Sequence, residues 1–144
     1  MLKIREMTED DVKRVSEIEE ECFSMPWKPD DFIEMIKRDD MTYLVALLDE
    51  TIIGGAGIRI VVDVGEITNV AISGEYRGRG YSIPLMEELL AKGIQLGAGS
   101  FTLEVRVSNV PAIALYRRFG FKDEGIRPGF YESPREDALI MWKY

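Results

Sequence analysis

The fold of this chain is decided by one stretch, Val70-Ala71-Ile72-Ser73-Gly74-Glu75-Tyr76-Arg77-Gly78-Arg79-Gly80-Tyr81-Ser82. We expect a strand to end near Ile72, a glycine-rich turn to follow it, and an amphipathic helix to begin at about Tyr81. Glycines at alternate positions permit backbone conformations that side chains forbid. The first turn of a helix also leaves amide donors unpaired at the positive end of the helix dipole. The stretch therefore predicts a site for a phosphate or pyrophosphate group.

Two other interpretations of this stretch exist. The residues also fit an ordinary tight turn between a strand and a helix, with Arg77 and Arg79 in solvent. A dinucleotide-binding fold is disfavoured, because the three-glycine spacing is missing and the strand lies in the middle of the chain.

The length and composition indicate one globular domain spanning residues 1–144. The chain is 46% hydrophobic and 31% charged, and its length is enough to bury a core without disulfides. No apolar run approaches the length of a membrane span, and the N-terminus lacks the apolar stretch of a signal peptide. A single cysteine fits a reducing compartment. We therefore expect a cytoplasmic protein with no membrane partner.

Charge and histidine content exclude several classes of function. The net charge of −8 argues against direct nucleic-acid binding and suits a basic protein partner. The chain contains no histidine, which excludes Ser-His-Asp chemistry and any metal site that needs imidazole. A general base must then be a carboxylate, a tyrosine or a neutral lysine, and we expect no metal cofactor.

The first forty residues predict a short strand and two helices. The strand covers residues 2–5, and Thr8 is expected to cap a first helix whose apolar face includes Cys22. Cys22 is therefore interpreted as a core residue rather than a nucleophile. A second helix is expected over residues 28–38. Trp27 either fills the gap between the two helices or belongs to a wall over a substrate groove.

The rest of the chain predicts a mixture of strands and helices. The expected strands cover residues 43–48, 51–61, 66–72, 101–107, 121–126 and 138–142, and the expected helices cover residues 81–96 and 111–119. Turns are expected at residues 49–50 and 63–65, and a loop at residues 128–131. Three glycines in the strand 51–61 indicate a bulge or a close backbone approach.

Several segments carry a resemblance to a known superfamily. Arg77-x-x-Gly80-x-Ser82 resembles the Q/R-x-x-G-x-G/A loop that binds the acyl-CoA pyrophosphate in GNAT acetyltransferases, with Ser82 where that family usually has Gly or Ala. The segment from Asn109 to Phe121 is similar to the N-x-x-A-x-x-L-Y-x-x-x-G-F segment of the same superfamily. Three further stretches resemble the ribosomal-protein-alanine N-acetyltransferases (RimI-like enzymes), namely residues 23–27, 103–106 and 135–141.

This resemblance implies an α/β protein with the GNAT fold, a central, mixed and splayed β-sheet with helices on both faces. Acetyl-CoA is the implied co-substrate, lying where two neighbouring strands part. Glu104 matches the general base of the family and Tyr116 its general acid. Tyr131 stands where the family has an aromatic residue near the acceptor, and Trp27 is the second candidate for substrate binding. The implied cofactor-binding residues are Val70, Ala71, Ile72, Arg77, Gly78, Arg79, Gly80, Tyr81, Ser82 and Asn109.

The chemistry of acetyl transfer suits these residue types. A free α-amine, with a pKa of roughly 8, must lose a proton as it attacks a thioester, and a carboxylate such as Glu104 is a suitable acceptor. A hydroxyl such as that of Tyr116 is able to protonate the departing thiolate. In the alternative interpretations Glu104 is a solvated residue paired with Arg106, Tyr116 is a core residue, and Tyr131 is exposed in a mobile loop.

We therefore expect an acetyltransferase that moves the acetyl group of acetyl-CoA directly to the N-terminal amine of a protein. The expected acceptor is an N-terminal alanine of a small-subunit ribosomal protein, a basic partner that an acidic enzyme attracts. The alternatives are a GNAT enzyme that acetylates a small amine or a lysine side chain, and an acyl-CoA-binding module without turnover.

Overall fold

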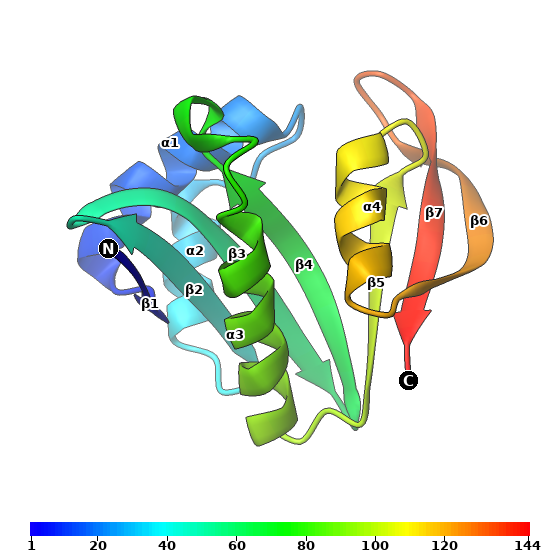
Figure 1. Cartoon of the computed structure of the whole chain (residues 1–144), viewed down its shortest axis with the longest axis horizontal. Coiled ribbons are helices and arrows are strands. Elements are labelled where there is room, and N and C mark those ends of the chain that lie inside the picture. Colours follow the sequence, from blue (N-terminus) through cyan, green and yellow to red (C-terminus); the bar gives the residue numbers. More distant parts are fainter.

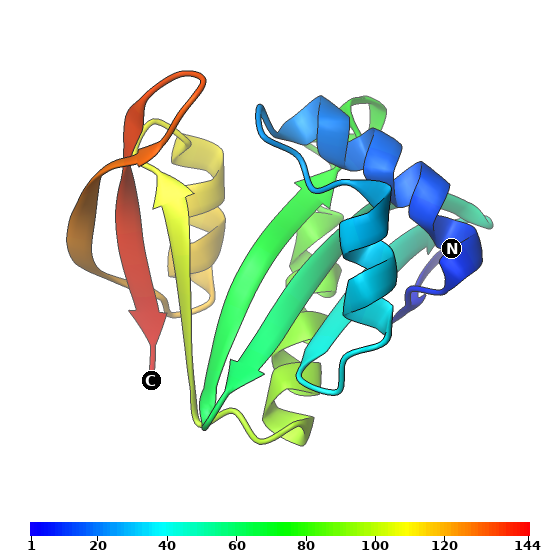
Figure 2. The same ribbon diagram turned by 180° about the vertical axis from the view of Figure 1, so that it is seen from behind.

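A seven-stranded sheet runs through the middle of the molecule, with helices on both of its faces (Figures 1 and 2). The structure is a computed structural model and describes all 144 residues. The strands are β1 (Leu2–Glu6), β2 (Met41–Leu48), β3 (Thr51–Val61), β4 (Val64–Ile72), β5 (Ser100–Arg106), β6 (Lys122–Tyr131) and β7 (Glu136–Lys143). The α-helices are α1 (Val12–Cys22), α2 (Pro29–Ile36), α3 (Ser82–Gln95) and α4 (Val110–Arg118).

The sheet is mixed and splits near its middle. Its strand order is β1-β2-β3-β4-β5-β7-β6, and β4 with β5 is the one parallel pair. These two strands pair only over residues 64–66 and 100–102, and beyond those residues they diverge (Figures 1 and 2). The mixed, splayed sheet that the resemblance predicted is confirmed.

Each face of the sheet has its own apolar core. The larger core contains 19 buried residues and includes Leu85, Met86 and Leu89 of α3, which cover the same face as α4 (Figure 1). The smaller core contains eight buried residues and includes Val15 of α1 and Phe32 of α2, on the opposite face (Figure 2). The two helical layers therefore fix the sheet from both sides.

The glycines of β3 serve close approach, as predicted. A Cβ at Gly55 would overlap the ring of Tyr43, a buried residue of the neighbouring strand. The pairing of β2 with β3 also shifts by one residue between Ala46 and Leu47, where Ile53 beside Gly54 is the extra residue of β3, which is the predicted bulge. The turn at residues 49–50 is also confirmed, with Asp49 and Glu50 at φ values of 49° and 72°.

The other two predicted connections are displaced. Val62 and Asp63 form the turn between β3 and β4, with Val62 at a φ of 59°, in place of residues 63–65. Gly65 lies in β4, paired with Phe101 of β5, and a Cβ there would come within 2.8 Å of the Phe101 ring. Residues 128–131 are not a separate loop. They end β6, where the pairing with β7 is irregular, and residues 132–135 make the connection.

Candidate active site

The divergence of β4 and β5 divides the molecule into two arms, residues 1–99 and residues 100–144. The predicted site residues lie on both arms. Val70, Ala71 and Ile72 end β4 on one arm, and Glu104 lies in β5 on the other. Tyr131 ends β6 on the β5 arm, and its pKa is raised by burial and by the charge of Glu104. Tyr131 in turn contributes to raising the pKa of Tyr116, which α4 supplies. Glu104, Tyr116 and Tyr131 therefore all lie on the β5 arm.

The segment between β4 and α3 has the backbone of an anion-binding loop. Gly78 and Gly80 have φ values of 75° and 80°, and a Cβ at either position would meet no atom within 4 Å. Glycine is therefore required at these two positions by the backbone conformation and not by crowding from neighbouring atoms. Tyr81 occupies the N-cap of α3 and makes no capping hydrogen bond with its side chain, and Ser82 is the first residue of the helix. Because no side chain caps the N-terminus of α3, its first amides are not occupied by a side-chain acceptor that would compete with a ligand.

The two arginines of the loop differ in their contacts. Arg77 turns back to the end of β4, where its Nε donates to the Ile72 carbonyl at 3.0 Å and its Nη2 lies 3.0 Å from Cys22 Sγ. Arg79 is exposed and lies 5.8 Å from the centre of the Tyr76 ring. Burial raises the pKa of the half-buried Cys22 thiol, which opposes formation of a nucleophilic thiolate.

Glu104 pairs with Arg127 and not with Arg106, which corrects the pairing considered for a solvated Glu104. Its Oε2 lies 3.5 Å from Arg127 Nη1, and its side chain is 30% exposed. Arg106 turns away to Glu136, with which it forms an ion pair at 3.2 Å. The Glu104 carboxylate is thus partly open to solvent and is able to accept a proton directly or through a water molecule.

Tyr116 is buried in the larger core and retains its proton over the neutral range. Its ring packs edge-on against Phe121, with centroids 5.9 Å apart. Burial raises the pKa of its hydroxyl well above the usual value, and burial likewise raises the pKa of Tyr131 to about 12. Tyr116 is therefore a core residue whose hydroxyl stays protonated, which is the state that a general acid needs.

Asn109 and Trp27 have structural contacts of their own. Asn109 Oδ1 accepts a hydrogen bond from the Ala112 amide at 3.3 Å and thereby caps α4. Trp27 packs against Phe32, with ring centroids 5.7 Å apart, and lines a hollow of about 350 Å³ together with α2. Trp27 thus lies in the α1–α2 layer, as the gap-filling interpretation has it. The contact of Asn109 with pantetheine and the role of Trp27 in substrate binding stay predictions.

One buried carboxylate, which lies on α1 and bonds to β4, was not predicted from the sequence. Glu19 is 2% exposed, and both of its oxygens accept from Asn69 Nδ2, at 3.1 and 3.2 Å. Burial raises the pKa of Glu19 to about 7. The sequence does contain a signal for this burial. Position 19 falls on the apolar stripe of α1 together with Val15 and Cys22.

We expect Glu19→Gln to remove a pH dependence from the stability of the protein. The pKa of Glu19 is about 7 when folded and 4.5 ordinarily, so between these values the folded state binds more protons than the unfolded state. The stability that Glu19 contributes is full below pH 4.5 and is lost as the pH rises through 7. Its size is roughly 3 kcal/mol, from 1.36 kcal/mol per pKa unit. Urea unfolding from pH 5 to 8 measures it.

The control for this experiment is Glu17→Gln, since Glu17 lies on the same helix with its side chain 53% exposed. We expect this control to unfold with the pH dependence of the wild type. Equal changes in the free energy of unfolding between pH 5 and 8 for Glu19→Gln and the wild type contradict the prediction.

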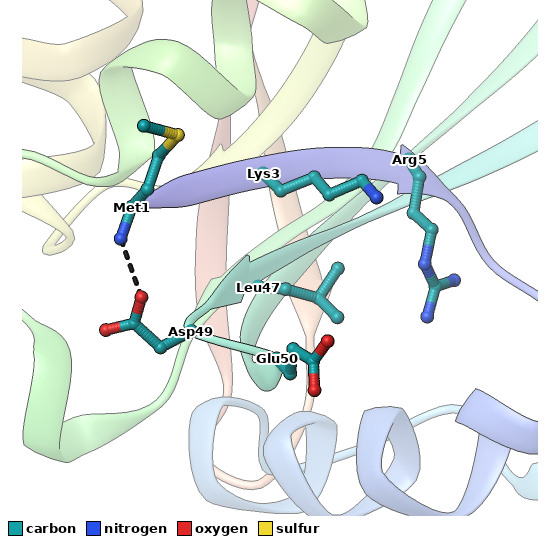
Figure 3. Close-up of a pocket in the computed structure, with 6 residues that line it drawn as sticks. All are labelled: Met1, Lys3, Arg5, Leu47, Asp49 and Glu50. Atoms are coloured by element: carbon teal, nitrogen blue, oxygen red, sulfur yellow. Dashed lines mark hydrogen bonds and ion pairs between the residues drawn. The ribbon is translucent and has the colours of Figure 1, made fainter.

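Features away from the opening between β4 and β5 do not add to the site. A hollow of about 450 Å³ lies at the outer edge of the sheet along β1, lined by Lys3, Arg5 and Leu47 among others (Figure 3). There the N-terminal ammonium group pairs with Asp49 at 2.8 Å (Figure 3). Nowhere do three His, Cys, Asp or Glu side chains gather in a way that could hold a metal ion. None of the helices has the length and apolar character needed to cross a membrane.

Comparisons with known proteins agree with this geometry. Residues 12–121 match the model of the acetyltransferase (GNAT) family. A protein of Bacillus subtilis (strain 168), provisionally named ribosomal protein bS18-alanine N-acetyltransferase, is 41% identical over 140 residues, which cover 96% of this chain and 93% of the relative.

Solved structures have the same fold. The crystal structure of the ribosomal-protein-S18-alanine N-acetyltransferase from Escherichia coli superposes with a TM-score of 0.90 at 28% identity, over 99% of this chain and 93% of the other. Arabidopsis thaliana NAA60 in complex with acetyl-CoA superposes with a TM-score of 0.87 at 20% identity, over 99% and 97% of the two chains. The chain therefore belongs to the GNAT family of acetyltransferases and is an N-acetyltransferase.

Proposed function

We propose that this enzyme transfers the acetyl group of acetyl-CoA to the N-terminal α-amine of a protein that begins with alanine. The proposed acceptor is a small-subunit ribosomal protein in the cytoplasm. The single observation that carries the proposal is the opening between β4 and β5, which has the glycine-rich loop of residues 77–82 on one arm and Glu104, Tyr116 and Tyr131 on the other. The B. subtilis and E. coli relatives are named for acetylation of a ribosomal alanine, which supports the choice of acceptor.

The co-substrate is proposed to lie across the open ends of the two strands. The unpaired edge of β4 at residues 70–72 offers backbone groups to the acetyl and pantetheine portions, and Asn109 lies at the start of α4 on the opposite arm. Residues 77–82 supply two arginines and the first amides of α3 for the pyrophosphate. A similar fold with bound acetyl-CoA supports this placement.

The proposed reaction is a direct attack. The amine nitrogen forms a bond to the thioester carbonyl carbon while Glu104 takes the proton that the amine loses. The carbon–sulfur bond then breaks, and the Tyr116 hydroxyl gives its proton to the CoA sulfur. The protonated state of Tyr116 and the partly exposed carboxylate of Glu104 are the states that these two steps need.

Charge supports a basic acceptor. Residues 9–40, which hold α1 and α2, contain twelve acidic and five basic side chains, so this segment carries −7 of the net charge of −8. A lysine- and arginine-rich protein that presents its N-terminus near the α1–α2 linker would be attracted by this layer. The attraction is expected to weaken with added salt, because screening shortens the range of charge interactions.

We expect a peptide with an N-terminal alanine to be the preferred acceptor in a panel read by release of free CoA. A bulky first residue must displace wall atoms, so kcat/KM is expected to be about tenfold higher for the Ala-starting peptide than for its Leu-starting counterpart. The control is the same Ala-starting peptide with its N-terminus already acetylated. Faster acetylation of this blocked peptide at lysine, or of a free polyamine, contradicts the proposed acceptor class.

A further inference from the structure

The two arms of the molecule are held together differently at their two ends. At the closed end, residues 64–66 of β4 pair with residues 100–102 of β5, and the Gly99 amide bonds to the Asp63 carbonyl at 2.7 Å. At the open end, Arg106 Nη2 donates to Ser24 Oγ at 3.1 Å. This is the one side-chain hydrogen bond of the structure that joins residues 1–99 to residues 100–144. The open end is therefore fixed by a single polar contact.

Arg106 also organises the connection between β6 and β7. Its Nη1 donates to the Pro134 carbonyl at 2.8 Å, and its Nη2 donates to the Glu132 carbonyl at 3.1 Å. The guanidinium carbon lies 4.5 Å from the centre of the Tyr131 ring. Glu136 completes the set with an ion pair at 3.2 Å, and its second oxygen accepts from the Ser108 amide at 2.8 Å. One guanidinium thus holds Tyr131, the β6–β7 turn and the α1–α2 linker in a fixed arrangement.

We propose that Arg106 is a positioning residue that sets the separation between the α1–α2 linker (residues 23–28) and the β6–β7 turn (residues 132–135). This separation controls how the acceptor amine reaches Glu104 and which first residues are admitted. The inference deepens the proposed function and rests on it for the side from which the acceptor arrives. Arg106 acts through its neighbours and takes no part in proton transfer.

The geometry requires an arginine rather than another cation. A guanidinium is planar and offers several N–H donors in a rigid fork, so it is able to bond two carbonyls, a carboxylate and a hydroxyl at the same time. It also stacks on an aromatic ring. A lysine ammonium at position 106 would keep the charge opposite Glu136 but would lack the fork that joins Ser24 to the turn.

The test compares Arg106→Lys and Ser24→Ala with the wild type. We expect Arg106→Lys to raise KM for the Ala-starting peptide about tenfold, the effect of losing about 1.4 kcal/mol. The Kd for acetyl-CoA by calorimetry is expected to stay within about twofold, since the loop at residues 77–82 belongs to the other arm. The preference for Ala-starting over Leu-starting peptides is expected to fall by about fivefold. Ser24→Ala removes only the contact between the arms and is expected to shift the same quantities less.

Amide hydrogen exchange supplies a readout that does not depend on turnover. We expect faster exchange in residues 23–28 and 132–135 for both variants, with unchanged exchange in α3. The control is Arg59→Lys, because Arg59 is an exposed residue of β3 that pairs with Asp40 at 3.5 Å. This control is expected to match the wild type in KM, selectivity and exchange.

The outcomes separate this inference from the proposed function. If the wild type prefers a lysine side chain or a polyamine, the acceptor class is wrong, and KM is then measured for that preferred amine. Unchanged acceptor KM and unchanged exchange in folded Ser24→Ala and Arg106→Lys overturn the positioning role. An equal loss of affinity for acetyl-CoA and for the acceptor also overturns it, because that result indicates a general loss of structure.

Discussion

Replacing Tyr116 with Phe is expected to lower turnover by about 10²-fold or more, the usual scale for a positioned general acid. The substitution keeps the ring that packs edge-on against Phe121 and removes only the hydroxyl. Burial holds the proton on that hydroxyl, so the wild type has a donor ready when the CoA thiolate departs. The Phe variant must draw this proton from water, and the barrier to breaking the carbon–sulfur bond rises. Steady-state turnover at saturating acetyl-CoA and acceptor measures the effect.

A matched buried tyrosine separates catalysis from packing. Tyr43 is 4% exposed in the smaller core, and burial raises the pKa of its hydroxyl as it does for Tyr116. We expect Tyr43→Phe to leave turnover near the wild-type value. Acetyl-CoA is expected to bind Tyr116→Phe with nearly its normal Kd by calorimetry. Wild-type turnover in Tyr116→Phe shows that the tyrosine is only a core residue.

Glu104→Gln is the second substitution with a large expected effect. Gln keeps the size of the side chain and removes its basicity, so turnover is expected to fall about 10²-fold at pH 7. The deficit is expected to shrink as the pH rises past roughly 8, where an α-amine loses its proton without help. A pH–rate profile from pH 6 to 10, taken for both proteins, measures this convergence.

An exposed carboxylate of β6, a strand that β7 separates from β5, supplies the control for Glu104. Glu124 lies in β6 and is exposed. Glu124→Gln is expected to follow the wild-type profile over the whole range. A Glu104→Gln profile of the same shape and height as the wild type rules out proton acceptance by Glu104.

Most of the fold was predictable because its signals are local. The two glycines of the loop, the apolar stripes of the helices and the turn at Asp49 and Glu50 each depend on neighbouring residues. The displaced turn between β3 and β4 shows where such signals fail. Glycine is typical of turns, so the sequence predicted that Gly65 belongs to the turn. Its position instead requires a glycine because Phe101 of another strand packs against it. The residues around Gly65 do not indicate this contact, because Phe101 lies 36 positions further along the chain.

The same limit applies to the site. The resemblance indicated Glu104 and Tyr116, and the structure places both on the β5 arm, which also carries Tyr131. The partners of the charged groups were not predictable, because Arg106 and Glu104 share a face of one strand and yet turn to different segments. Glu19 was recognisable only as a charged position within an apolar stripe. Its partner Asn69 lies 50 positions away.

The divergence of β4 and β5 leaves one edge of each strand without a hydrogen-bonded neighbour in the middle of the sheet. Past residues 66 and 102 each strand has a partner on one side only, so peptide groups of both face a position that no strand of this chain fills. Such groups are strong hydrogen-bonding donors and acceptors, and they gain from any backbone-like ligand placed there. A molecule that binds them completes the sheet, and its binding energy adds to folding stability, by roughly 2.7 kcal/mol at a hundredfold excess over Kd. The unoccupied protein is for that reason the least stable form in its catalytic cycle.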